Sequence, residues 1–117
     1  MSGRADAERR GRRAEVRAAW WLRLKGYRIL ATRYRTPMGE IDLIARRGGC
    51  IAFIEIKARA TLEAGLEAVS PTARRRIARA AGAFLAQRGL AGASARFDVI
   101  VMRPRHLPCH IRDAWRL

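Results

Sequence analysis

The sequence is poor in acidic residues and cysteine, and it has no long apolar run. Its 117 residues include ten acidic side chains, and its two cysteines, Cys50 and Cys109, show no C-x-x-C spacing. Unpaired thiols of this kind are typical of a reducing compartment. No apolar run reaches the about 20 residues that span a bilayer, and the first residues lack the apolar segment of a secretory signal. We therefore expect a cytoplasmic protein without a membrane partner.

The length and the positive charge of the chain indicate one domain and a polyanionic partner. A chain of this length suits a single domain, 1–117, in which residues 1–10 are expected to fray. The 25 basic residues, of which 23 are arginine, give a net charge of +15. Such an excess favours nucleic acid ahead of an anionic membrane surface. Because an arginine- and alanine-rich composition can also follow from genomic bias, charge indicates a class of partner and no chemistry.

The apolar pattern predicts an α/β domain. Two helices and five strands, the last one short, are expected at 5–25, 27–34, 40–45, 50–57, 71–88, 96–102 and 109–112. Ser70 and Pro71 suit the N-cap and the first position of the second helix, and residues 60–69 are expected to fray. The order α-β-β-β-α-β predicts a mixed central sheet flanked by helices.

The segment GEIDLIARRGGCIAFIEIK predicts a β-hairpin with polar side chains near its open end. A Gly-Gly pair, here at 48–49, is a preferred two-residue hairpin loop because both glycines reach positive φ without strain. With these glycines in the turn, Asp42 falls opposite Glu55, and Glu40 falls opposite Lys57. Asp42 and Glu55 then share one face of the hairpin, with their Cβ atoms about 5 Å apart.

Two facing carboxylates are costly in this apolar setting. Their neighbours on both strands are mostly isoleucine, leucine and phenylalanine. Burying an unpaired carboxylate among such residues either costs several kcal/mol of folding free energy or makes the group take up a proton. Lys57, two residues after Glu55, offsets one of the two charges. A divalent cation offsets both, and ligation by oxygen alone favours Mg²⁺ or Mn²⁺. The alternative is an exposed sheet edge on which Asp42, Glu55 and Lys57 form surface ion pairs.

A third acid, Glu15, lies on the apolar face of the first expected helix. Ala18, Ala19 and Leu22 follow it at helical spacing, on the face turned to the core. A glutamate near a helix start can also extend to solvent, but together with the hairpin acids Glu15 is interpreted as a member of the same cluster. Asp98, in the fourth expected strand, is interpreted as a structural, hydrogen-bonded residue.

Asp42 followed by Glu55-Ile56-Lys57 matches the D-x(n)-E-x-K motif of the PD-(D/E)XK nuclease superfamily. The wider match is more specific. The segments RAEVRAAWWLRLKGYRIL, GEIDLIARRGGCIAFIEIKAR, RFDVIVM and IRDAW resemble the YraN-like family of bacterial proteins, and the resemblance covers residues 11–115. It implies a restriction-endonuclease-like core related to that of archaeal Holliday junction resolvases.

The resemblance also implies roles for residues that the pattern singles out. Glu15, Asp42, Glu55 and Lys57 would form the catalytic set of a metal-dependent endonuclease. Asp42, Glu55 and the carbonyl of Ile56 would hold Mg²⁺ or Mn²⁺, with Glu15 acting through water or on a second ion. Lys57 would orient the attacking water and stabilise its deprotonated form.

One position departs from the family pattern. Near the start of the second helix, where members often carry a lysine, this chain has Ala73, and the neighbouring Arg74 is the residue that could supply the charge. Arg35 and Arg59 flank the acidic strands and, with Arg74, are the expected contacts to a nucleic acid backbone. The missing lysine leaves the positioning of a substrate open.

Two main classes of function follow from these features. The first is a nuclease that hydrolyses phosphodiester bonds, with DNA, including branched DNA, as the expected substrate. The second is a nucleic-acid-binding protein that keeps the nuclease fold without turnover, and an assembly module whose basic surface binds another protein or a membrane is a third. A resolvase-like role would favour a homodimer, because a four-way junction offers paired cleavage positions.

Overall fold

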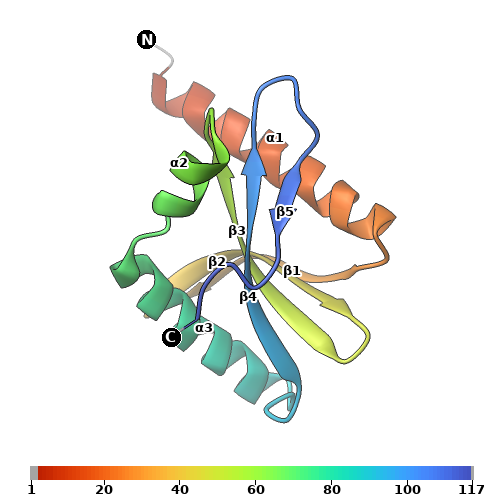
Figure 1. The fold of residues 1–117 in the computed structure, drawn as a ribbon. Coiled ribbons are helices and arrows are strands. Elements are labelled where there is room, and N and C mark those ends of the chain that lie inside the picture. The colour runs from red at the N-terminus through yellow and green to blue at the C-terminus, as the bar shows by residue number, and fades with distance from the viewer. Residues whose placement is uncertain (1–2, 117) are drawn as a thin grey trace.

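Three helices and five strands make up the computed structural model, which describes residues 3–116 and the side chains of residues 11–116 (Figure 1). In chain order they are α1 (Gly3–Leu24), β1 (Arg28–Thr36), β2 (Gly39–Arg47), β3 (Cys50–Ala58), α2 (Leu62–Glu67), α3 (Pro71–Gln87), β4 (Ser94–Met102) and β5 (Cys109–Ile111). Residues 1–2, part of the segment expected to fray, lie outside the described residues, and α1 includes the rest of that segment. No helix within residues 3–116 is long and apolar enough to cross a membrane.

The strands form one mixed sheet in the order β1-β2-β3-β4-β5. β3 and β4 run parallel, while the other neighbouring pairs are antiparallel. The chain crosses from β3 to β4 through α2 and α3, since parallel neighbours need a long connection. The mixed sheet and the α-β-β-β-α-β order agree with the prediction, and β3 is the central strand.

The β2–β3 hairpin has the register that its glycine pair predicts. Arg47 pairs with Cys50 across the two-residue loop, in which Gly48 has a φ of +60°. The ladder ends where Leu43 pairs with Ile54. Asp42 and Glu55 follow directly after that last pair, so they lie at the point where the two strands separate.

Beyond this point β2 stays with β1 instead of β3. Glu40 pairs with Arg35 of β1 in the sheet, and the nearest oxygen of its carboxylate lies 3.5 Å from Nε of Arg35. The predicted pairing of Glu40 with Lys57 is therefore wrong, because the β2–β3 ladder ends at the pair of Leu43 and Ile54, three residues away from Glu40.

Apolar side chains form two clusters, one on each face of the sheet. Helix α1 covers one face, where Leu22 belongs to the same buried cluster as Leu43 and Ile54. Helices α2 and α3 cover the other face (Figure 1). There the rings of Phe84 and Phe53 meet edge to face. Burial of each such side chain contributes about 1.5–3 kcal/mol. The sheet is covered on both faces, as the continuous apolar run of β3 predicts.

Helix α2 corrects the expectation that residues 60–69 would fray. The hydroxyl of Thr61 caps this helix by accepting a hydrogen bond from the N–H of Ala64 at 3.1 Å. Gly65 packs directly on Val101 of β4, where a Cβ atom would find no room. A helix of six residues is not stable on its own, so its packing against β4 decides that it forms. The local signals for it are Thr61 at the N-cap and Glu63 in the first turn.

Helix α3 begins where the sequence predicts. Ser70 is its N-cap, with Oγ accepting a hydrogen bond from the N–H of Ala73 at 3.1 Å, and Pro71 occupies the first turn. The helix passes close to the start of β2, where a Cβ atom on Gly39 would lie 3.0 Å from Cβ of Arg76. A larger side chain at position 39 would push α3 away from the hairpin that carries Asp42.

Candidate active site

The carboxylates of Asp42 and Glu55 lie together where β2 separates from β3. Oδ2 of Asp42 accepts a hydrogen bond from the backbone N–H of Ile56 at 2.8 Å. Oε1 of Glu55 accepts one from the backbone N–H of Asp42 at 3.4 Å. Each carboxylate thus takes a backbone hydrogen bond from the opposite strand after the ladder has ended. The two acids meet, as the hairpin register predicts.

Burial leaves both acids short of compensating charge. Burial raises the pKa of Asp42 despite the hydrogen bond from Ile56, and the charge of Glu15 raises it further. Burial, followed by the charge of Asp42, raises the pKa of Glu55 to about 8. A carboxylate with such a pKa is stabilised in its ionised form by any additional cation nearby. The pair therefore has the electrostatics of a cation site.

Lys57 supplies one positive charge to this pair. Its Nζ atom lies 4.0 Å from Oε2 of Glu55, and the two side chains are 27% and 12% exposed. Its charge lowers the pKa of both Asp42 and Glu55, against the larger effect of burial. This low exposure of Glu55 rules out the alternative of an exposed sheet edge with surface ion pairs.

Glu15 approaches the pair from α1, but its carboxylate is engaged by Arg33. Nε of Arg33 donates to Oε2 of Glu15 at 2.8 Å. The burial of Ala18 and Leu22 agrees with the predicted core-facing side of this helix. Among the contacts of residues 11–116, none joins the carboxylate of Glu15 directly to Asp42 or to a second acid. Glu15 acts on Asp42 through its charge alone.

Arg33 is the residue of this site that the sequence did not reveal. It lies in β1 with a φ of +49°, a left-handed conformation that costs energy for any residue with a Cβ atom. The hydrogen bond and charge of Glu15, and then the charges of Glu40 and Asp42, raise the pKa of Arg33. Strained backbone concentrates at functional sites. As one of 23 arginines, Arg33 carried no signal that set it apart.

The residues at this site fit a divalent cation in part. In a strand the N–H and C=O of one residue point to the same neighbouring strand, so the carbonyl of Ile56 lies on the side of Asp42. Two carboxylates and a carbonyl are ligands that suit Mg²⁺ or Mn²⁺. Over the part of the chain that the structure describes, no three His, Cys, Asp or Glu side chains form a group that could hold a metal ion. Glu15, the expected third acid of the site, is paired with Arg33 instead.

Two of the arginines expected to contact nucleic acid are exposed. The side chain of Arg35 is 72% exposed, beside Glu40. Arg59 follows β3 directly and is also exposed, with Nη1 donating to the carbonyl of Ala58 at 2.8 Å. Both guanidinium groups keep donors free toward solvent, since five N–H donors are available on each.

Arg74, the third of these arginines, is held by the fold. Its Nε donates to the carbonyl of Val69 at 3.0 Å, and its guanidinium carbon lies 5.8 Å from the ring centre of Trp115. In the described residues it forms no ion pair with Asp42 or Glu55. Its Nη1 and Nη2 groups keep their donors, so its contact with nucleic acid in place of the lysine at position 73 stays a prediction.

Comparison with known proteins places this site in a family. Residues 14–102 match the family described as Uncharacterised protein family UPF0102. The chain belongs to the UPF0102 family. It is 53% identical over 116 residues to a UPF0102 protein of Paramagnetospirillum magneticum, a match that covers 95% of this chain and 90% of that relative. UPF0102 proteins of Chelativorans sp. and Rhizorhabdus wittichii are 52% and 45% identical, over 96% and 98% of this chain and 91% and 98% of their own.

Membership of UPF0102 confirms the resemblance to the YraN-like family. The matched range begins just before Glu15 in α1 and ends at Met102, the last residue of β4. It therefore includes Arg33, the hairpin acids and Lys57. The names of the relatives state no activity, so the function must be argued from the geometry of the site.

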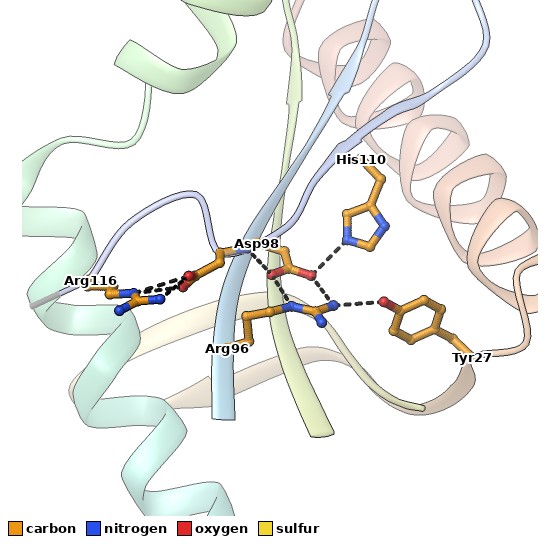
Figure 2. A network of polar contacts seen from close by, with 6 residues as sticks. Tyr27, Arg96, Asp98, His110 and Arg116 are labelled. Atoms are coloured by element: carbon orange, nitrogen blue, oxygen red, sulfur yellow. Dashed lines mark hydrogen bonds and ion pairs between the residues drawn. The ribbon is translucent and has the colours of Figure 1, made fainter. Parts of the chain in front are cut away.

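A second polar cluster in this UPF0102 protein surrounds Asp98 of β4 (Figure 2). Asp98 is fully buried. It accepts hydrogen bonds from Nε and Nη2 of Arg96, both at 2.8 Å, from Nε2 of His110 at 2.7 Å and from the backbone N–H of Asp113 at 2.9 Å. Arg96 also donates to the hydroxyl of Tyr27 at 2.7 Å. The cluster connects β4, β5 and the turn after α1.

The chemistry of this cluster is that of a structural ion pair. Burial alone would raise the pKa of Asp98, but the hydrogen bonds from His110, Arg96 and the Asp113 amide lower it below its ordinary value. A carboxylate with four donors has no lone pair left for a ligand. Figure 2 shows Asp98 enclosed between Arg96 and His110. The interpretation of Asp98 as a structural, hydrogen-bonded residue agrees with these contacts.

Proposed function

We propose that this UPF0102 protein is a metal-dependent nuclease that hydrolyses phosphodiester bonds in nucleic acid. The observation that carries the proposal is the partly buried pair of Asp42 and Glu55, in which the pKa of Glu55 rises to about 8 beside a single lysine. A second cation is what this pair lacks. The spacing of Asp42, Glu55 and Lys57 is also that of the PD-(D/E)XK motif, whose members the sequence resembles.

Each residue of the site has a defined role in this proposal. Asp42, Glu55 and the carbonyl of Ile56 would hold Mg²⁺ or Mn²⁺. When bound, the ion would polarise the scissile phosphate and offset its charge. Lys57 would donate hydrogen bonds to the attacking water and stabilise its deprotonated form. Glu15 could reach water or a second ion only after its ion pair with Arg33 had opened.

The substrate we propose is DNA, including branched DNA. The net charge of +15 favours a polyanion, and the exposed guanidinium groups of Arg35 and Arg59 suit phosphate oxygens. The choice of DNA, a cytoplasmic location and a homodimer on a two-fold junction come from the resemblance and from the composition of the chain.

Cleavage assays test the proposal directly. Labelled duplex, single-stranded and four-way-junction DNA are incubated with the protein in Mg²⁺, Mn²⁺ or EDTA. We expect cleavage that requires the metal and that falls by about 100-fold or more in Asp42→Asn and Glu55→Gln. Glu67→Gln, which neutralises an exposed acid at the end of α2, is the matched control and should retain full activity. Binding without cleavage in any metal would reject the proposal.

The second candidate is a nucleic-acid-binding protein without turnover. The observation that favours it is the engagement of Glu15 by Arg33, which takes a carboxylate away from the proposed site. This candidate predicts DNA binding that is equal in EDTA and Mn²⁺ and unchanged by Asp42→Asn. Binding that does not weaken as salt is raised would exclude both candidates, since phosphate contacts release counterions.

A further inference from the structure

A pocket of about 430 Å³ lies where β3 and β4 leave the sheet beside α1. Its lining comes from three segments of the chain: residues 13, 14 and 17 of α1, residues 58–60 and residues 102–104. The carboxyl ends of β3 and β4 meet here because these strands are parallel, and this is the edge at which open α/β sheets bind ligands. Ala58 of the pocket follows Lys57 directly, so the pocket adjoins the proposed active site at the same end of β3.

The charged groups that line this pocket all have the same sign. Arg13, Arg17, Arg59 and Arg103 belong to the lining, and no acidic residue does. Arg13 and Arg17 lie one helical turn apart on α1, so their side chains project from the same face. Guanidinium groups match the geometry of phosphate oxygens. The rim of the pocket is therefore suited to a phosphorylated ligand.

The floor of the pocket is apolar. Ala14, Ala58, Met102 and Pro104 contribute it, and Met102 is only 7% exposed. A phosphate by itself gains nothing from an apolar surface, whereas a nucleobase does. Proteins that bind single strands combine a basic groove with aromatic side chains on which bases stack, and arginine adds cation–π contacts. Among the described residues, the lining of this pocket has no aromatic residue, so its arginines are the groups that can stack on a base.

The geometry points to this pocket as a subsite for one unpaired nucleotide of a nucleic acid strand. The arginines hold the phosphate, and the base rests on the apolar floor. The inference rests on the proposed function, because it names the substrate class of that same protein: a strand with an unpaired nucleotide next to the scissile bond, as at a fork or junction. A paired base would first have to leave its stack, which costs energy.

Binding in EDTA tests this subsite without any cleavage. Fluorescence anisotropy compares a labelled single-stranded oligonucleotide with an abasic strand of equal length. The wild-type protein should prefer the strand that carries bases. The double variant Arg13→Ala/Arg17→Ala should bind the single strand about tenfold more weakly at moderate salt. The control Arg75→Ala/Arg79→Ala removes two exposed arginines at the same spacing from α3, and should change the affinity by less than about threefold.

A second variant tests the floor without changing charge. Ala14→Leu fills the pocket from α1 and should abolish the preference for base-carrying strands while binding to the abasic strand stays unchanged. Equal affinity of the wild-type protein for the two strands would overturn the inference. So would an equal loss of affinity in the two double arginine variants.

This test is independent of the nuclease activity. If the subsite variants behave as expected and no DNA is cleaved in any metal, the subsite stands and the proposed nuclease falls. If DNA is cleaved but the pocket variants bind single strands as tightly as the control variant does, the subsite alone is rejected.

Discussion

Oδ2 of Asp42 takes the place of a strand partner for the backbone N–H of Ile56, at 2.8 Å. The same carboxylate stands beside Glu55, whose Oε1 accepts the N–H of Asp42. Asp42 therefore has a structural role as an acceptor and an electrostatic role as a charge. Substitutions that remove one property and keep the other separate the two roles.

The free energies of unfolding of two Asp42 variants test its role as a hydrogen-bond acceptor. Asp42→Ala leaves the N–H of Ile56 without its acceptor, whereas Asp42→Asn keeps an oxygen in place. A polar group that loses its partner away from water costs about 1 kcal/mol or more, so Asp42→Ala should unfold at lower urea concentration than Asp42→Asn. Equal free energies of unfolding for the two variants would contradict the contact.

Glu55 should make stability fall as pH rises. The pKa of Glu55 rises from an ordinary 4.5 to about 8 in the folded protein, so between these values the folded state binds more protons than the unfolded state. The free energy of unfolding then decreases with pH across this window. Glu55→Gln removes this effect. Above pH 8 its free energy of unfolding should be higher than that of the wild type by on the order of a few kcal/mol.

Thermal melts in EDTA at a series of pH values measure this effect of Glu55. The wild type and Glu55→Gln should differ least at about pH 4, where the carboxyl group is protonated in both states. The gap should widen steadily toward pH 8. A difference in melting temperature that stays constant across the pH series would show that Glu55 does not cause the pH dependence.

Arg33 should restrain the metal affinity of the site. Both Arg33→Gly and Arg33→Ala release Glu15 and remove a cation whose pKa is raised first by Glu15 and also by the charges of Glu40 and Asp42. Mn²⁺ should then bind about threefold or more tightly, because the local charge becomes more negative. Titration followed by electron paramagnetic resonance measures this affinity. Arg35→Ala, in the same strand and beside Glu40, is the control and should bind Mn²⁺ as the wild type does.

The two Arg33 variants should differ in stability. Only glycine adopts a φ of +49° without strain, so Arg33→Gly should melt at a higher temperature than Arg33→Ala. The reverse order would mean that β1 relaxes to an ordinary strand conformation once the ion pair is lost.

Asp98 should dominate acid stability through its buried ion pair. Its pKa is lower in the folded protein than in the unfolded chain, so its contribution is complete above about pH 4 and is lost as pH falls through the folded pKa. Asp98→Asn leaves Arg96 without its charge partner, and breaking a buried pair costs about 3 kcal/mol or more. Urea unfolding at neutral pH measures this loss.

Asp113, whose backbone N–H binds Asp98, gives a matched control for the Asp98 variant. The side chain of Asp113 pairs only with the exposed Arg116 among the described contacts, and it is its backbone N–H that binds Asp98. Asp113→Asn should therefore change stability little. If it destabilised the protein as much as Asp98→Asn does, the network of Figure 2 would not depend on the buried carboxylate.

The hairpin acids could be predicted from the sequence because local rules determine their positions. The Gly-Gly loop sets the register at Arg47 and Cys50, and that register carries Asp42 to Glu55. The apolar spacing on α1 likewise turns Glu15 toward the sheet. These relationships depend on turn geometry and helical periodicity, which a sequence states directly.

Other parts of the site depend on contacts between distant segments, which no local sequence pattern predicts. The ion pair of Arg33 with Glu15 joins β1 to α1. Helix α2 forms because Gly65 fits against Val101, and the basic pocket gathers residues from three segments. Such features depend on how the helices pack against the sheet, and a local sequence pattern does not determine this packing.

A crystal structure with Mn²⁺ shows whether Asp42 and Glu55 hold a metal ion. Anomalous scattering identifies the ion, and we expect one peak between the carboxylates of Asp42 and Glu55, at about 2.2 Å from an oxygen of each. Glu55→Gln crystals treated in the same way should lose the peak. Manganese bound elsewhere at saturating metal, with no ion at either carboxylate, would show that Asp42 and Glu55 do not form a metal site.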